Sequence, residues 1–332
     1  MKTLVIGGGG FLGQYIVEQL LERGDSVSSL ARNDYPHLRK MGVRVLRGDL
    51  EDEQAVSKAC AGMEVVFLVA ANDSMWGPWK AFYGPNVLGA RHVIKACKTH
   101  KVPKLIYTST PSTVFANKPL EGCDESLPYP QKPESHYTKS KAMAEQLVLA
   151  ANGEDLLTCA LRPHLIFGPR DPHLLIKLIE LGLKQKMFQV GDGAIKYDFT
   201  FVEDAARTHL LAADKLIRGS PVAGSVYFIT QNEPVIFYPW LNALYEKLGI
   251  PPIKKRLSLP VARFIGAVLE TIRFSLPVVT LPPFTRFLAS KLAMSSYYDI
   301  SKAQHDLGYE PQHTMDEALE KTLPYLREHF KL

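Results

Sequence analysis

Short apolar runs alternate along the chain with stretches in which apolar residues recur every three or four positions. The first run, residues 3–6, consists of aliphatic and β-branched side chains, as a strand buried on both faces requires. In the next stretch Leu12, Ile16 and Leu20 fall on one helical face, and Gly24 is well placed to end the helix. The pattern therefore predicts a strand, a glycine-rich loop and a helix, in that order.

The alternation repeats through the first half of the chain. Further strands are expected at residues 26–30, 43–46, 64–69, 104–110 and 156–161, and helices at 51–60, 86–98 and 137–149. Strands that alternate with helices predict an α/β fold with a Rossmann-type, doubly wound parallel sheet. Beyond Pro163 the pattern loosens, which is typical of a smaller, mostly helical substrate lobe.

Two domains are expected from this change of pattern. A chain of 332 residues exceeds the size at which one core usually keeps growing. We assign residues 1–165 to a dinucleotide-binding domain, with return segments near 195–215 and 225–232, and residues 166–332 to a C-terminal substrate-binding lobe.

Composition and charge exclude several classes of protein. Hydrophobic residues make up 46% and charged residues 22%, as in soluble globular proteins. A net charge of +5 without any Lys/Arg-rich run argues against a nucleic-acid partner. The histidines are not at ligand spacing, so no metal site is expected, and no apolar run is long enough to span a bilayer.

The four cysteines, Cys60, Cys97, Cys123 and Cys159, are scattered without C-x-x-C spacing. The chain starts with MKTLVIGGGG, the pattern of a strand and a glycine loop rather than of a cleavable leader. We therefore expect reduced thiols and a cytoplasmic location.

The glycine loop GGGGFLG predicts a dinucleotide site. Gly7, Gly10 and Gly13 stand between a strand and a helix, where glycine lets the backbone approach a pyrophosphate and the helix N-terminus favours its charge. We expect these glycines to contact the dinucleotide together with Phe11 and Leu12. The alternative is a plain strand-to-helix turn.

The end of the second strand bears on the choice of dinucleotide. An acid there would bind the ribose of NAD, but the sequence SLARND has apolar residues in that place, and Arg32 follows, with a planar fork that suits a 2′-phosphate. NADP is favoured, and NAD stays open because Asp34 could reach the ribose. Asp49 and Leu50, in RGDL after the third strand, are expected beside the adenine.

Tyr137 and Lys141 lie one helical turn apart in SHYTKSKAMAE. Residues four apart share a helix face, so the ammonium could lower the pKa of the phenol from about 10. A phenol with a lowered pKa could act as a general acid or base. The alternative is an ordinary surface pair.

The ordered motifs GGGGFLG, RGDL, VFLVAA, YTSTPS, YTKSK, LRPHLIFGP and GDGAIKYDFTFVEDAA cover nearly the whole chain. With them the chain resembles the extended short-chain dehydrogenase/reductase superfamily. The branch that it resembles most is the 3β-hydroxysteroid dehydrogenase type, which includes sterol-4α-carboxylate dehydrogenases and bacterial 2-alkyl-3-oxoalkanoate reductases. The segments RPHLIFGPRDP and GDG are most similar to the last group.

The resemblance implies catalytic roles for four residues. Tyr137 would transfer the proton, and Lys141 would hold the nicotinamide ribose. Thr110 would bind the substrate oxygen, with Ser112 as the alternative, and Asn86 would support a water relay to the lysine.

The resemblance also implies that Ala70 and Ala71 lie under the cofactor and that Pro163, with His164, faces the nicotinamide. By analogy we expect a homodimer formed through the helices at 86–98 and 137–149.

Residues 258–293 form the most apolar region of the chain. At helical spacing Arg263, Glu270 and Arg273 fall on one side and leave a broad apolar face that includes Phe264 and Ile272. This face is expected either to dock on the core of its own lobe or to form a wall for a hydrophobic substrate. Contact with a membrane surface is compatible with both.

These features predict an NADP(H)-dependent dehydrogenase/reductase that acts on CH–OH groups. It would interconvert a secondary alcohol and a ketone on a hydrophobic substrate of the 2-alkyl-3-oxoalkanoate or 3β-hydroxysteroid type. Two alternatives stay open, a nucleotide-sugar epimerase with tightly bound NAD and a non-catalytic NADPH-sensing protein.

Overall fold

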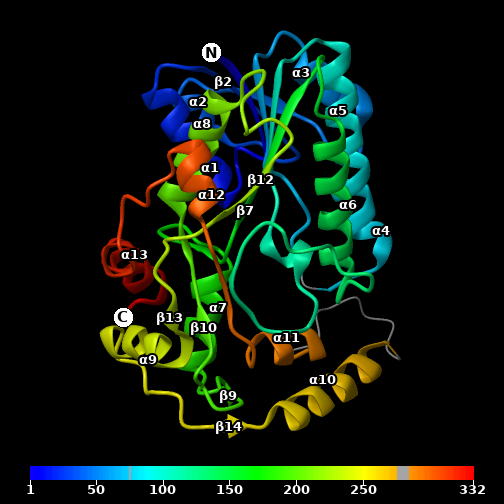
Figure 1. Cartoon of the computed structure of the whole chain (residues 1–332). Coiled ribbons are helices and arrows are strands. Elements are labelled where there is room, and N and C mark those ends of the chain that lie inside the picture. Colours follow the sequence, from blue (N-terminus) through cyan, green and yellow to red (C-terminus); the bar gives the residue numbers. More distant parts are fainter. Residues whose placement is uncertain (75, 275–283) are drawn as a thin grey trace.

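A seven-stranded parallel sheet forms the centre of the protein, with the strand order β12-β7-β5-β4-β1-β2-β3 (Figure 1). The computed structural model describes residues 1–74, 76–274 and 284–332. The strands of this sheet are β1 (Lys2–Ile6), β2 (Ser26–Ala31), β3 (Arg44–Arg47), β4 (Val65–Leu68), β5 (Lys104–Thr108), β7 (Leu157–Pro163) and β12 (Val226–Ile229). The predicted Rossmann-type sheet is therefore confirmed.

Helices cover both faces of the sheet, as the uninterrupted apolar strands require. Along β1, Leu4 and Ile6 pack into one core and Val5 into the other, because successive side chains of a strand point to opposite faces. One face is covered by α1 (Phe11–Glu22) and α8 (Val202–Lys215). The other face is covered by α3 (Glu53–Cys60), α5 (Gly89–Thr99) and α6 (His136–Ala150).

The strand register aligns the ends of the strands at one edge. Ile6, the last residue of β1, pairs with Leu30 of β2 and Leu68 of β4, and Thr108 of β5 pairs with Leu161 of β7. Ligands of doubly wound sheets bind outside this carboxyl edge. The loops that follow these strands are therefore expected to form the ligand-binding site.

Most of the rest of the chain packs below this edge in Figure 1, whereas α12 lies beside α8 and β12. It contains a four-stranded sheet with the order β13-β10-β15-β6 and two strand pairs, β11-β8 and β14-β9. These strands are β6 (Leu120–Cys123), β8 (Ile166–Phe167), β9 (Gln189–Val190), β10 (Lys196–Tyr197), β11 (Thr200–Phe201), β13 (Val235–Ile236), β14 (Arg256–Leu257) and β15 (Ser296–Tyr298). The helices are α7 (Leu174–Leu183), α9 (Phe237–Lys247), α10 (Leu259–Phe274), α11 (Arg286–Lys291), α12 (Ser301–Leu307) and α13 (Met315–Phe330).

The helix expected at 86–98 begins differently in the structure. Its first part belongs to a π-helix, η1 (Tyr83–Leu88), which continues directly into α5 and is preceded by α4 (Trp79–Phe82). Pro85 lies inside η1 and has no backbone N–H to donate, so a regular α-helical bond is lost there. Two short helices were also not predicted, α2 (Pro36–Lys40) and the 3₁₀ helix η2 (Pro111–Val114).

The prediction for the apolar helix α10 was partly wrong. Glu270 is buried, because its carboxylate pairs with Arg286, with 2.7 Å between Oε2 and Nε. Ile265 packs inward, whereas Phe264 is 70% exposed and Ile272 also faces solvent. Residues 275–283 of the predicted region and the Arg273 side chain lie outside the described part.

Helix α10 therefore docks on its own lobe with one stripe and exposes another, and membrane contact through the exposed stripe stays a prediction. In the described part of the chain, no helix combines the length and the apolar character that a bilayer crossing needs.

Candidate active site

The glycine loop between β1 and α1 has a backbone that a ligand can approach closely. Gly7 has a φ of +95°, and a Cβ on Gly13 would lie 2.1 Å from the Gly7 carbonyl oxygen. Only glycine fits these two positions without a backbone shift. Gly10 precedes α1 without a side-chain cap, and the first turn, which includes Phe11 and Leu12, has no acidic residue. The exposed N–H groups and the helix dipole thus fit a pyrophosphate.

Two arginines meet at the ends of β2 and β3. Arg32 follows Ala31 and is exposed, and the Arg47 Nε donates to the Arg32 carbonyl oxygen over 3.2 Å. Asp34, which could have reached a ribose, pairs instead with Arg39, with 3.0 Å between Oδ1 and Nη2. The sequence analysis quoted Arg47 as the first residue of RGDL but assigned it no role.

The residues expected around the rest of the dinucleotide line the same edge. The Ala70 N–H donates to the Ile6 carbonyl oxygen over 2.8 Å, which holds the chain after β4 against Gly7. Asp49 is half-buried and its Oδ1 accepts from the Glu51 N–H, while Leu50 is buried. Ala71, next to Ala70, is partly accessible.

The start of α6 positions the tyrosine and the lysine. Ser135 and Thr138 form a reciprocal capping box, so the helix begins at His136 and puts Tyr137 and Lys141 one turn apart. Lys141 is buried, its Nζ donates to the Thr108 carbonyl oxygen over 2.7 Å, and the ammonium lies 4.4 Å from the centre of the Tyr107 ring.

The expected lowering of the tyrosine pKa was wrong for this structure. Burial raises the pKa of Tyr137 above its usual value, the charge of Asp73 adds to the rise, and a hydrogen bond with Thr110 opposes it. Burial also lowers the pKa of Lys141 to about 7, against the charges of Glu145 and Asp73. Spacing alone could not show this, because desolvation depends on what packs around the helix.

Thr110 is the hydroxyl that the structure brings to Tyr137. It ends the loop after β5 and caps η2, with its Oγ1 accepting from the Ser112 N–H over 3.3 Å. Ser112 lies within η2 and is half-buried. The geometry favours Thr110 over Ser112 as the group beside the phenol.

Asn86 is buried in η1 and links the loop after β4 to α6. Its Oδ1 accepts from the Asn72 N–H over 2.7 Å, and its Nδ2 donates to the Asn72 carbonyl oxygen and to Ser140 Oγ. Ser140 in turn donates to the Tyr137 carbonyl oxygen. Asn86 therefore positions the helix that carries Tyr137, and its role in a water relay stays a prediction.

A buried ion pair behind the site was missed. Arg162 of β7 donates through Nε and Nη2 to the two carboxylate oxygens of Glu145, at 2.9 and 2.6 Å, and Tyr129 also donates to Glu145. Both charged side chains are almost completely buried. Glu145 lies one turn beyond Lys141, so the pair ties α6 to the central sheet.

At the end of β7, Pro163 is buried and His164 follows it. The His164 Nδ1 lies 2.6 Å from Asp198 Oδ1. Burial lowers the pKa of His164 more than Asp198 raises it, so the imidazole is neutral near pH 7 and donates its Nδ1 proton to the carboxylate.

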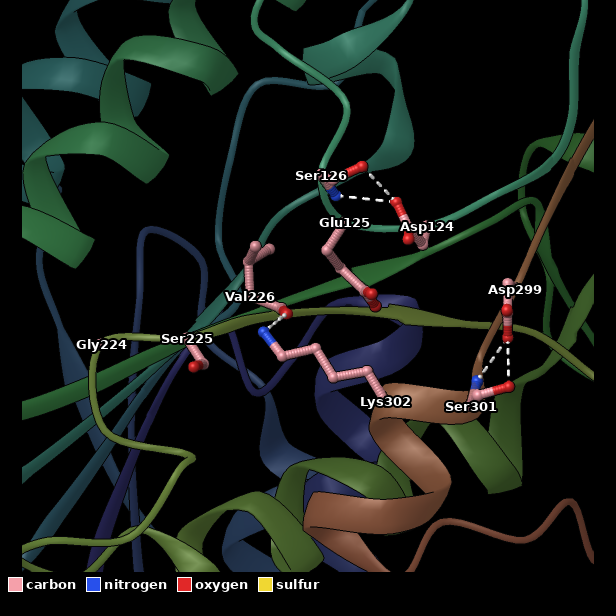
Figure 2. Close-up of a pocket in the computed structure, with 9 residues that line it drawn as sticks. All are labelled: Asp124, Glu125, Ser126, Gly224, Ser225, Val226, Asp299, Ser301 and Lys302. Carbon is pink, nitrogen blue, oxygen red and sulfur yellow. Dashed lines mark hydrogen bonds between the residues drawn. The ribbon is translucent and has the colours of Figure 1, made fainter.

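A cavity of about 450 Å³ lies elsewhere, at the amino end of β12 (Figure 2). Its lining includes Asp124, Ser225 and Lys302, and the Lys302 amine donates to the Val226 carbonyl oxygen over 3.1 Å. The amino end of a strand is opposite to the edge where doubly wound sheets bind ligands. We therefore place the active site at the carboxyl edge and not in this cavity.

A family model and individual relatives both identify the same family of dehydrogenases and reductases. Residues 4–261 match the model of the 3-beta hydroxysteroid dehydrogenase/isomerase family. The chain is 42% identical to 2-alkyl-3-oxoalkanoate reductase of Stenotrophomonas maltophilia, over 97% of this chain and 98% of that protein. It is 38% identical to human sterol-4-alpha-carboxylate 3-dehydrogenase, decarboxylating, over 98% of this chain and 88% of that protein.

Solved structures show the same fold at lower identity. UDP-glucose 4-epimerase of Thermus thermophilus, in complex with NAD, superposes with a TM-score of 0.74 at 25% identity, over 98% of this chain and 99% of that chain. UDP-glucuronic acid 4-epimerase of Bacillus cereus gives 0.76 at 23% identity, over 99% of this chain and 100% of that chain.

Proposed function

Because the chain belongs to the 3-beta hydroxysteroid dehydrogenase/isomerase family, an extended short-chain dehydrogenase/reductase family, we propose that it reduces a hydrophobic 3-oxo acid with NADPH. The enzyme is an oxidoreductase that acts on hydroxyl or keto groups. The observation that carries the proposal is the meeting of Thr110, Tyr137 and Lys141 at the edge where the glycine loop opens.

The protein's own residues would supply the general acid and hold the coenzyme and the substrate in position. The glycine loop and the N-terminus of α1 would hold the dinucleotide, which supplies a hydride when bound. Tyr137 keeps its proton at neutral pH because burial raises its pKa, so it can protonate the substrate oxygen as negative charge builds there. Thr110 would donate to the same oxygen, and Lys141 would hold the ribose.

The names of the relatives narrow the range of candidate substrates. The Stenotrophomonas enzyme is named for a 2-alkyl-3-oxoalkanoate, and the human enzyme for a sterol 4α-carboxylate that is oxidised at position 3. In both names a carboxylate stands on the carbon next to the reacting carbon. We place a 2-alkyl-3-oxoalkanoate first, since that relative matches over the full length of both chains, and a sterol carboxylate second.

Three features support NADP(H) as the coenzyme. Ala31 stands where an NAD-binding acid is expected, Arg32 and Arg47 lie together beside it, and Asp34 is paired with Arg39. The guanidinium groups of Arg32 and Arg47 would suit a 2′-phosphate, because each presents a planar fork of donors.

The test of the proposed function is the reduction of 2-hexyl-3-oxodecanoate. Purified protein should consume NADPH with this substrate, seen as a loss of near-ultraviolet absorbance. Tyr137→Phe should lower kcat by about 100-fold or more, the usual contribution of a general acid. Tyr325→Phe, on α13 far along the chain, is the matched control and should keep the rate of the unmodified protein.

Full turnover by Tyr137→Phe would refute the mechanism. An epimerase would give a different result, since it would retain NAD through purification and interconvert UDP-sugars without net consumption of coenzyme. Extraction of the bound nucleotide from the purified protein distinguishes the two activities.

A further inference from the structure

Lys291, the last residue of α11, holds a cation without a counter-charge. Its Nζ lies 3.6 Å from the centre of the Phe115 ring and 6.0 Å from that of Phe287. In the described part of the chain the ammonium has no hydrogen-bond acceptor and no carboxylate partner. Burial lowers the pKa of Lys291 to about 7, because desolvation disfavours its charged form.

Two contacts relate Lys291 to the loops that follow β5 and β7, because its ammonium lies on the Phe115 ring and its charge acts on His164. Phe115 follows η2, so at the rise of a 3₁₀ helix it stands about 10 Å from Thr110. The Lys291 carbonyl oxygen accepts from the Tyr197 hydroxyl, and the Tyr197 ring stacks on His164, with 5.8 Å between ring centres. Figure 1 shows α11 below the ends of the central strands, between them and α10.

The carboxylate of Asp198, which follows Tyr197 in the chain, already has its partners. Asp198 Oδ1 binds His164 at 2.6 Å, and its Oδ2 accepts from the Tyr298 N–H over 2.8 Å. His164 is neutral near pH 7, and Tyr197 and Tyr298 keep their protons because burial raises the pKa of both. The printed contacts of the Lys291 ammonium are therefore with aromatic rings, and no carboxylate among the described residues pairs with it.

We propose that Lys291 binds the carboxylate of the substrate and thereby selects 3-oxo and 3-hydroxy acids over neutral ketones and alcohols. This assignment rests on the proposed function, because it names the group that recognises the acid in the same site. The ammonium would form a charge-assisted hydrogen bond with the carboxylate. The aromatic surroundings exclude water, which strengthens that bond.

A structural role for Lys291 is the competing explanation. A lysine that holds the lobe together would be expected to donate to a carbonyl or carboxylate of the protein, as Lys104 does with Ala213. Lys291 instead points its charge at a ring, and part of its side chain stays accessible to a ligand.

The experiment compares an acid with its neutral ester. Oxidation of 2-hexyl-3-hydroxydecanoate and of its methyl ester is followed with NADP⁺, because 3-hydroxy acids do not decarboxylate as 3-oxo acids do. Lys291→Met keeps the length of the side chain and removes the charge, and Lys291→Arg keeps the charge. Melting temperature and NADPH binding confirm that each variant is folded.

We expect Lys291→Met to lower the acid-over-ester ratio of kcat/KM by about 10- to 100-fold, mainly through KM, as the loss of one charged hydrogen bond requires. Lys291→Arg should keep the ratio within about threefold, since the charge remains. An unchanged ratio in a folded Lys291→Met variant that turns over both compounds would overturn the assignment and leave the proposed function standing. Failure of the unmodified protein on both compounds would refute the proposed function and the assignment with it.

Discussion

The pKa values of single residues in the site depend more on burial than on the nearest charges. Tyr137 and Lys141 shift their pKa values in opposite directions, and in both cases burial is the largest cause. A buried phenol stays protonated and a buried ammonium loses its proton more easily. The tyrosine is thus prepared to give a proton to a substrate oxygen, which suits the reductive direction.

The coenzyme preference is a prediction at this scale. Arg32→Ala and Arg47→Ala should each lower the NADPH-over-NADH ratio of kcat/KM by about 10-fold or more, since each removes charge-assisted hydrogen bonds to a 2′-phosphate. Steady-state rates with both coenzymes measure the ratio. Arg44→Ala, at the other end of β3, is the control, and an unaltered ratio in both test variants would argue for NAD.

A buried histidine should make stability depend on pH. His209 donates from Nδ1 to the Ala205 carbonyl oxygen, so its Nε2 accepts from Thr108 Oγ1, at 2.8 Å. Burial lowers the pKa of His209 to about 4 from an unfolded value near 6.5. The unfolded chain therefore binds more protons between these values, and His209 contributes stability above about pH 6.5 that is lost as pH falls toward 4, by about 3 kcal/mol.

Urea unfolding at pH 7.5 and pH 5 tests this dependence on pH. The loss of unfolding free energy on acidification should be smaller in His209→Gln than in the unmodified protein. His305→Gln, which alters an imidazole that is 87% exposed, should keep the full loss. An equal loss of unfolding free energy between pH 7.5 and pH 5 in all three proteins would show that His209 does not cause the dependence on pH.

Among the elements, α6 carries the chemistry and is held from two sides. Asn86 of η1 binds it through Ser140, and Arg162 of β7 binds it through Glu145. The π-helical geometry of η1 follows from Pro85, and it brings the Asn86 amide to the loop after β4. Two elements thus position one helix face, which is why Tyr137 lies beside Thr110.

Removing one partner of the buried pair should destabilise the protein. Glu145→Gln leaves Arg162 charged in a buried place, and the free energy of unfolding should fall by about 3–5 kcal/mol. Urea unfolding measures the loss. Glu320→Gln breaks the exposed pair with Lys247 and should cost far less, because solvent screens charges at the surface. Similar costs for the two variants would contradict the structural role of the buried pair.

At the scale of the whole molecule, the two lobes exchange elements. Strand β12 and helix α8 return to the central sheet, while β6, from the first part of the chain, pairs with β15 of the small sheet. The site lies where these parts meet, so residues far apart in the chain line it. The domain boundaries, the cytoplasmic location and a dimer through the helices at 86–98 and 137–149 stay predictions.

The sequence by itself determined the alternation of the main strands and helices of the central sheet, the glycine loop, the family and the Tyr137–Lys141 pair, because each is a local pattern that its own residues encode. Only the tertiary structure decided which way the pKa values move, which face of α10 is buried, that Arg47 meets Arg32, and that Arg162 pairs with Glu145 behind the site. Desolvation and pairing depend on groups that the fold brings together over long stretches of chain, and no local pattern records them.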